Sequence, residues 1–135
     1  MKIISSVMLL ALCQIATAHA ADRSCKFVLG YAEPKPAWFT VTGDATLHAG
    51  KGKLEVQMFD ERMKGQLSHQ LVGTLKGDRV NGTMRNLFSD EGKNTVTGSY
   101  SLSRYTDGQG PHIVESVVVG NPFLFIAVTC HESGT

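Results

Sequence analysis

The chain has 135 residues, of which 42% are hydrophobic and 19% charged, a balance that excludes both a disordered and a membrane-embedded protein. Its 13 basic and 12 acidic residues nearly cancel, and removing Lys2 with the leader described below leaves 12 of each. Phosphates and anionic lipids attract a basic surplus. Neutrality therefore argues against a nucleic-acid partner and against a polybasic membrane-surface protein.

The N-terminus carries the pattern of a secretory signal peptide. Lys2 supplies a positive charge, Ile3 to Ala18 is mostly apolar, and Ala18-His19-Ala20 fits the small-x-small cleavage rule. The apolar stretch is short for a membrane span, which needs about 20 residues. We expect residues 1–20 to be a cleaved signal, residues 21–135 to be one domain, and the protein to be exported to a periplasmic or extracellular space.

Export determines how the cysteines are interpreted. Cys13 leaves with the signal, so the mature domain keeps Cys25 and Cys130. In an oxidising compartment, two cysteines most simply form one disulfide. Closing a loop of about 100 residues would stabilise the fold by roughly 4.7 kcal/mol in the chain-entropy model. A redox pair usually has C-x-x-C spacing and a metal site needs two more ligands, so both alternatives are less favoured.

The remaining sequence predicts a succession of short strands. Alternating apolar residues and β-branched runs, separated by Gly, Asp and Asn clusters, recur over 25–31, 38–47, 54–58, 67–76, 79–88, 95–105, 112–120 and 123–130. Asp60 to Gly65 fits a short helical turn as well as a strand. Even spacing of this kind predicts an all-β, antiparallel barrel or sandwich.

Two hairpins define the predicted registers. Lys76-Gly77-Asp78-Arg79 is a two-residue turn signal, and counting back from it pairs His69 with Asn86. Across the predicted loop 106–111, Tyr105 pairs with His112. Along 95–105, Tyr100 shares a face with apolar residues and glycine, while serines and threonines occupy the other face. The Tyr100 face is therefore predicted to be the inner one.

The cysteine positions favour a closed barrel. Cys25 begins the first strand and Cys130 ends the last, and in a closed meander with an even strand number these two strands are antiparallel neighbours. Gly73, Gly82 and Gly98 supply the bends that closure requires. We predict a small up-and-down barrel of about eight strands, with a β-sandwich whose termini meet as the alternative.

In strand number and size the chain resembles the lipocalin-like and avidin-like barrels. The resemblance covers strand rhythm alone. Trp38 follows Pro36-Ala37, so the lipocalin G-x-W signature is absent, and an avidin-like site needs several tryptophans where this chain has one. The resemblance therefore implies a barrel architecture and identifies no site residue in this chain.

Polar residues on the predicted inner face are candidates for a ligand pocket. They are His69, Asn86, Tyr100, Arg104 and Glu115. The predicted register sets Arg104 diagonally across from Glu115, within reach of a long side chain. His, Asn, Tyr, Arg and Glu converging beside two glycines would form a small-molecule site. The simpler interpretation is an Arg104–Glu115 ion pair and a packed histidine.

The C-terminal segments also carry candidate interface residues. Val114 and Val118 are predicted to point outward while their neighbours point inward, so this strand is apolar on both faces. Such a strand is normally covered by a partner protein, a second copy or a packed helix. Trp38, beside two prolines, is either a further interface residue or a core residue at the barrel end.

Motifs for catalysis or cofactor binding do not occur in the sequence. The mature-domain histidines, at positions 48, 69, 112 and 131, lie far apart in the sequence, and neither G-x-S-x-G nor a phosphate-binding glycine loop is present. We therefore predict an exported, non-enzymatic protein-binding module without metal or cofactor, an inhibitor or immunity-type protein of the cell envelope. The alternatives are a carrier of a small ligand inside the barrel and a hydrolase-type enzyme using Glu115 or His69.

Overall fold

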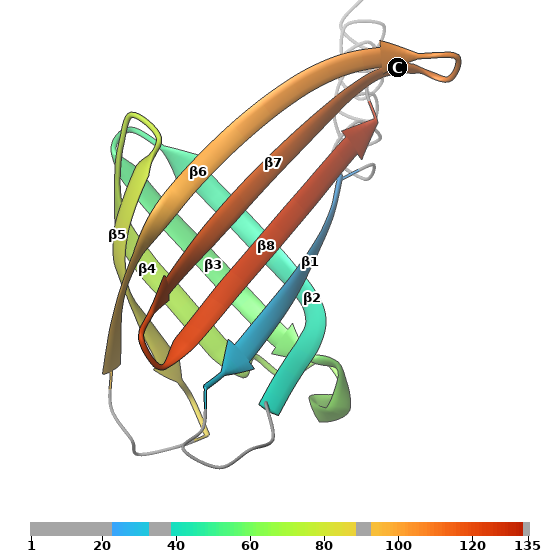
Figure 1. Ribbon diagram of the computed structural model, residues 1–135. Coiled ribbons are helices and arrows are strands. Elements are labelled where there is room, and N and C mark those ends of the chain that lie inside the picture. The colour runs from blue at the N-terminus through green and yellow to red at the C-terminus, as the bar shows by residue number, and fades with distance from the viewer. Residues whose placement is uncertain (1–22, 33–38, 89–92, 134–135) are drawn as a thin grey trace, which may run out of the picture.

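A computed structural model describes residues 23–32, 39–88 and 93–133. Eight antiparallel strands form a closed barrel in sequence order (Figure 1). They are β1 (Arg23–Tyr31), β2 (Phe39–Gly50), β3 (Lys53–Asp60), β4 (His69–Lys76), β5 (Arg79–Asn86), β6 (Lys93–Asp107), β7 (Gly110–Asn121) and β8 (Leu124–Ser133). The predicted barrel is confirmed and the sandwich alternative is wrong. The signal peptide and Trp38 lie outside the described residues.

The barrel closes where the first strand meets the last. β1 pairs with β8 from Arg23–Glu132 to Tyr31–Leu124, and within this ladder Cys25 lies directly opposite Cys130. The two cysteines form the predicted disulfide, with their Cα atoms 4.0 Å apart. A covalent bond thus fixes the seam of the barrel, as suits an oxidising compartment.

The predicted hairpin registers are confirmed, including His69 opposite Asn86 and Tyr105 opposite His112. The predicted loop 106–111 is wrong, because pairing continues to Asp107–Gly110 and leaves a two-residue turn. The Asp107 side chain accepts a hydrogen bond from the Gln109 amide, and Gly110 has a φ of 113°. These two features stabilise a tight turn where turn-forming residues had suggested a loop.

Strand alternation fills the interior with apolar side chains. The fully buried ones, at most 2% exposed, include Phe27, Leu29, Leu54, Val56, Met58, Leu71, Val80, Met84, Val96, Val117, Ile126 and Val128. The serines and threonines of β6 are exposed, as predicted. The middle of the barrel is therefore a packed core. No described segment is a helix with the length and apolar character needed to cross a membrane.

The two ends of the barrel differ in shape. The disulfide end holds the β2–β3, β4–β5 and β6–β7 hairpins, and the opposite end holds the 3₁₀ turn η1 (Glu61–Met63). Pairing of β6 with β5 stops at Ser99, whereas pairing with β7 continues to Asp107. The β6–β7 hairpin therefore projects past the other hairpins and curves over the disulfide end (Figure 1).

Candidate functional site

The disulfide end of the barrel contains an open hollow of about 1030 Å³, called the mouth below. Its apolar lining includes Leu47, Ala49 and Leu54, with Gly73 beside them. Its charged lining includes Arg23, Lys51, Lys53, Glu55, Glu115 and Glu132. A site with an apolar base and a few charged groups has the composition of a small-molecule pocket.

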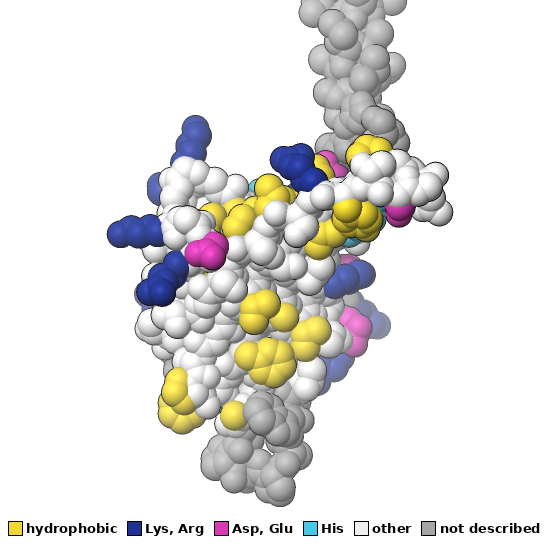
Figure 2. All heavy atoms as spheres, turned by 45° about the horizontal axis from the view of Figure 1, so that its top comes forward, with side chains coloured by type: hydrophobic (Ala, Val, Ile, Leu, Met, Phe, Trp, Pro, Cys, Tyr) yellow, Lys and Arg dark blue, Asp and Glu magenta, His cyan; other side chains and the backbone are white. Residues whose placement is uncertain are grey.

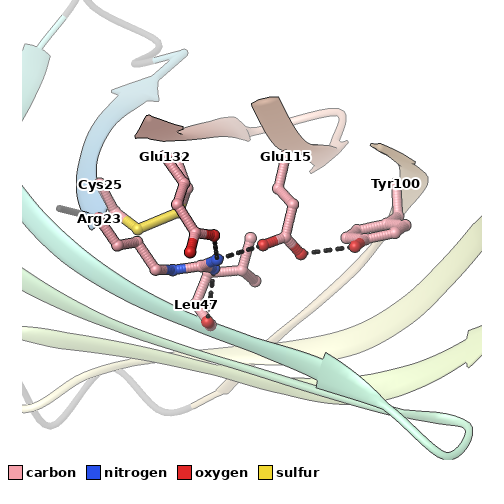
Figure 3. Close-up of a disulfide and its surroundings, with 7 residues drawn as sticks. Arg23, Cys25, Leu47, Tyr100, Glu115 and Glu132 are labelled. Carbon is pink, nitrogen blue, oxygen red and sulfur yellow. Dashed lines mark hydrogen bonds and ion pairs between the residues drawn. A yellow bond between two sulfur atoms is a disulfide. The ribbon is translucent and has the colours of Figure 1, made fainter. Parts of the chain in front are cut away.

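A chain of three polar side chains crosses the mouth (Figure 3). Arg23 Nη1 lies 2.5 Å from Glu115 Oε1, and the Tyr100 hydroxyl donates a hydrogen bond of 2.5 Å to Glu115 Oε2. Both carboxylate oxygens of Glu115 are therefore occupied. The three residues come from β1, β7 and β6, so this chain forms only when the barrel has closed.

Arg23 links this chain to two further strands. Its Nη2 donates to the Leu47 carbonyl on β2 at 3.0 Å, and its Nη1 lies 3.8 Å from the carboxylate of Glu132 on β8. The distance to Glu132 is too long for a hydrogen bond. The Glu132 carboxylate is 36% exposed, which leaves it accessible from the mouth.

These surroundings strongly change the pKa of the Tyr100 phenol. Burial, followed by the hydrogen bond to the negatively charged Glu115, raises the pKa of Tyr100 to about 12. The hydroxyl therefore keeps its proton throughout the neutral range and acts as a donor to Glu115. The positive charge of Arg23 opposes this shift without cancelling it.

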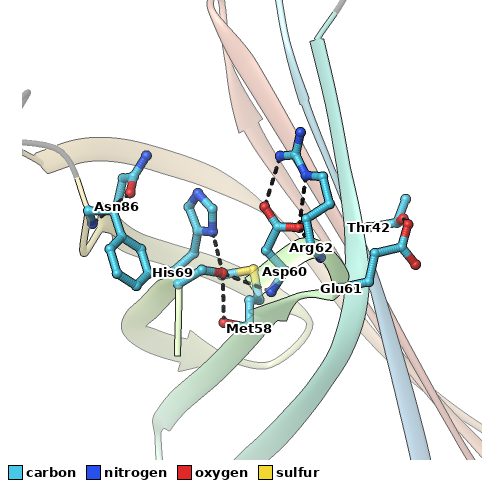
Figure 4. A network of polar contacts seen from close by, with 9 residues as sticks. Thr42, Met58, Asp60, Glu61, Arg62, His69 and Asn86 are labelled. Carbon is cyan, nitrogen blue, oxygen red and sulfur yellow. Dashed lines mark hydrogen bonds and ion pairs between the residues drawn. The ribbon is translucent and has the colours of Figure 1, made fainter. Parts of the chain in front are cut away.

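The η1 end of the barrel holds a second polar network (Figure 4). Asp60 accepts hydrogen bonds from the Arg62 amide at 2.9 Å and from the Arg62 guanidinium at 2.8 and 3.1 Å. Mainly because of the guanidinium hydrogen bonds, the pKa of Asp60 lies below its ordinary value. Asp60 thus caps η1 and stays ionised, although its side chain is nearly buried.

Ser68 and His69 extend this network into the core. The Ser68 hydroxyl accepts from the Asp60 amide at 2.9 Å and donates to the Met58 carbonyl at 3.1 Å. His69 Nδ1 lies 2.9 Å from the same hydroxyl oxygen, so with the hydroxyl proton directed at Met58 the imidazole is assigned as the Nδ1–H donor. Burial lowers the pKa of His69, which favours this neutral form.

The five predicted pocket residues do not converge on one site. Tyr100 and Glu115 meet in the mouth, while His69 and Asn86 pair at the η1 end. Arg104 lies diagonally from Glu115 as predicted, but it is exposed on the projecting part of β6. The cation that contacts Glu115 is Arg23 instead, so the predicted Arg104–Glu115 pair is wrong.

Sequence reasoning missed Arg23, although a signal for it was present. Arg23 lies two residues before Cys25, and period-two alternation places the two on the same side of a strand. Because Cys25 faces inward to form the disulfide, Arg23 had to face the interior near the last strand. A positive charge so placed needs a carboxylate nearby, which Glu115 provides.

The projecting hairpin carries a further polar group. His112 Nε2 lies 2.8 Å from Asp107, and its Nδ1 lies 3.0 Å from His131 Nε2. The Tyr105 ring stacks on His112 with a centroid distance of 4.7 Å. Two histidines that are distant in sequence therefore meet in space. Among the described residues, no group of three His, Cys, Asp or Glu side chains is arranged to hold a metal ion.

The predicted interface residues lie on the outside of the barrel. Val118 is 52% exposed, while Val114 is half-buried on the same outward side of β7. On the neighbouring β8, Phe125 is 41% exposed, and Phe123 in the β7–β8 turn is 67% exposed. Figure 2 shows hydrophobic side chains gathered in the middle of the face over β6–β8, with lysines and arginines nearer its edges.

Comparison with known proteins supplies no family for this chain. No protein-family model matches it, and no curated protein matches it. Among solved structures, the crystal structure of the ywiB protein from Bacillus subtilis shares 9% identity over 84% of this chain and 92% of that chain, with a TM-score of 0.34. Similarity at this level supports no conclusion about this protein.

Proposed function

We propose that this protein binds a small amphipathic molecule at the mouth of the barrel. The observation that carries the proposal is the hollow of about 1030 Å³, which is at the upper end of the usual size range for small-molecule sites. The sequence had offered a ligand inside the barrel as an alternative to protein binding, but the interior is filled by apolar side chains. A ligand would therefore sit above the core, between the projecting β6–β7 hairpin and the opposite rim.

The occupied polar groups hold the base of the mouth in shape. Each oxygen of Glu115 already has a partner, Arg23 on one and Tyr100 on the other, so Glu115 acts mainly in holding the strands together. The other charged groups of the lining, which a ligand could contact, are Glu132, Glu55, Lys51 and Lys53. An apolar ligand body would rest on the leucines of the lining, with a charged group near one of these side chains.

Two fluorescent probes of equal chain length test the proposal, a dansyl alkylamine and a dansyl alkylcarboxylate. Each is titrated into the mature, disulfide-bonded protein. We expect saturable binding of one probe at a single site, because a built pocket with fixed charges discriminates between the two charges. Binding of the amine would indicate Glu132 or Glu55 as the contact, and binding of the carboxylate would indicate Lys51 or Lys53.

Ala49→Phe is the test variant, because it adds a ring within the half-buried lining of the mouth. Asn81→Phe adds the same ring at an exposed outward position of β5 and is the matched control. Binding should weaken at least about tenfold in the first variant, a loss of roughly 1.4 kcal/mol, and stay unchanged in the second. Non-saturable binding, or equal binding by both variants, would refute the proposal.

Protein binding is a second candidate, and it is the function that the sequence favoured. The supporting observation is the outward apolar cluster that includes Val118 and Phe125. An inhibitor or immunity-type role and the lack of enzymatic activity stay predictions from the sequence. The charges and shape of the surface around this cluster limit what can cover it.

A further inference from the structure

The outer surface of the last three strands is free of charge over a wide area. We define the uncharged face as the outward positions of residues 95–103 on β6, 114–120 on β7 and 125–129 on β8. All of these positions carry Ser, Thr, Val, Ala, Gly or Phe. Charged side chains are depleted from the centres of protein interfaces, whereas they are common on surfaces that face water.

The same face has low relief at its end beside the β7–β8 turn. Phe125 lies between Gly30 on β1 and Gly120 on β7 in the strand register. A Cβ atom on Gly30 would come within 2.1 Å of the Phe125 ring, so the ring lies across the backbone of β1. Val118 lies opposite Ala127 in the adjoining row. Side chains of this size, interleaved with glycines, form a surface against which a second sheet can pack.

We propose that a second copy of this chain packs against the uncharged face in an isologous dimer. A twofold axis parallel to the strands sets the β5 edge of one copy over the β1–β2 edge of the other. The β5 edge carries Arg79 and Arg85. The other edge carries the Lys26–Asp44 ion pair, whose charges cancel, and the exposed, negatively charged Glu61. Opposite charges therefore meet at both edges while neutral surfaces meet at the centre.

The size of the face determines the strength expected of the dimer. Three strands spaced by about 4.8 Å, each contributing about eight residues of roughly 3.3 Å, cover about 380 Å² per copy. Two copies would bury about 760 Å², which is the size of a weak, transient interface. The dimer should therefore be weak, with a dissociation constant in the micromolar range, and should depend on protein concentration.

Sedimentation velocity of the mature, disulfide-bonded protein tests this proposal over concentrations from about 1 μM to about 1 mM. Val118→Lys is the test variant because it sets a charge at the centre of the uncharged face, near its own equivalent in the second copy. Val72→Lys is the matched control: Val72 is 51% exposed against 52% for Val118, and it points outward from β4. Circular dichroism confirms that each variant is folded.

We expect a reversible monomer–dimer equilibrium in the wild type, weakened at least about tenfold by Val118→Lys and unchanged by Val72→Lys. If Val118→Lys fails to fold, Ser99→Lys introduces the charge at the exposed neighbouring position on β6. A wild type that stays monomeric throughout the range overturns the proposal. So does a dimer that both lysine variants weaken equally, or that neither weakens.

Discussion

The two ends of the barrel both carry a polar network beside the core, but they assemble it in different ways. At the η1 end, Asp60 binds a residue two positions away, and Ser68 and His69 are adjacent in the chain. At the disulfide end, Arg23 and Glu115 come from the first and the seventh strands. One network is local in sequence, while the other joins strands that meet only on closure.

This difference indicates which end can host a ligand. The local network at the η1 end hydrogen-bonds its groups to one another and to the neighbouring backbone. The network at the disulfide end joins consecutive strands on either side of the barrel seam, and its Arg23–Glu132 distance of 3.8 Å is too long for a hydrogen bond. Long-range contacts therefore shape the mouth in which we propose that a ligand binds, whereas the local network stabilises the η1 turn.

Removing the disulfide should have the largest effect on stability, and it acts at the disulfide end of the barrel. We expect Cys25→Ala with Cys130→Ala to lower the free energy of unfolding by about 2–5 kcal/mol, since the bond closes a loop with a sequence separation of 105. Denaturant titration measures the loss, and the reduced wild type is the control. A decrease below about 1 kcal/mol would contradict a seam that depends on this bond.

Substituting two glycines tests how closely neighbouring strands must approach each other in the barrel. A Cβ atom on Gly98 would lie 1.9 Å from the Val118 carbonyl oxygen, whereas one on Gly50 at the mouth would meet nothing within 4 Å. We expect Gly98→Ala to cost about 3 kcal/mol of stability and Gly50→Ala less than about 0.5 kcal/mol. Thermal and denaturant unfolding of both variants provide the measurement. Equal losses of stability in the two variants would mean that β6 does not need to lie so close to β7 at Gly98.

The long-range network can be weakened at its central member. Glu115→Gln keeps an acceptor for Tyr100 but removes the negative charge that faces Arg23, so stability should fall by about 1–2 kcal/mol for this partly exposed pair. The pKa of Tyr100 should move down from about 12 toward 10, because the charge of Glu115 contributes to raising it.

Ultraviolet titration of the tyrosines measures that pKa, with Tyr100→Phe identifying the signal. The wild type has a further signature. An unfolded tyrosine ionises near pH 10 and the folded Tyr100 near 12, so the contribution of Tyr100 is complete below pH 10 and is lost between the two values. Glu115→Gln should narrow this alkaline window. A Tyr100 titration that does not respond to the substitution would argue against the hydrogen bond.

The sequence was sufficient for the architecture because each element of it is encoded locally. Period-two alternation defined the strands, Gly77-Asp78 defined a register, and Cys25 with Cys130 defined the seam. The candidate site was less predictable. Strand parity specifies which side chains face inward, but not how far along the barrel axis they lie, so His69 and Tyr100 were assigned to one pocket although they occupy opposite ends.

The partner of Glu115 shows a second reason why the candidate site could not be predicted from the sequence. Arg104 was chosen because it is a diagonal neighbour in one hairpin, whereas Arg23 reaches Glu115 from β1, past the single intervening strand β8. Contacts at the seam depend on which strands barrel closure brings together, and the register of a single hairpin does not contain this information. The extension of β6 and β7 past the rim likewise exposed Arg104, and the two-residue turn at 108–109 was not anticipated.

The smallest expected effect concerns the η1 end, where acid should weaken the local network. Burial lowers the pKa of His69 in the folded protein below the ordinary value of 6.5. As the pH falls through 6.5, the unfolded chain therefore binds a proton that the folded protein does not yet bind. The contribution of His69 is present above pH 6.5 and is lost below it, so stability should decline between pH 7 and 5.

His69→Gln should flatten this decline, because the amide keeps a donor for Ser68 but cannot be protonated. The free energy of unfolding at several pH values measures the slope, and His48→Gln, at an exposed position, is the control that should retain it. Asp60 does not interfere in this window: its pKa is held below 3.8, so its contribution is lost only in stronger acid. A wild-type slope that persists in His69→Gln would place the acid-sensitive group elsewhere, and the local network would then be insensitive to mild acid.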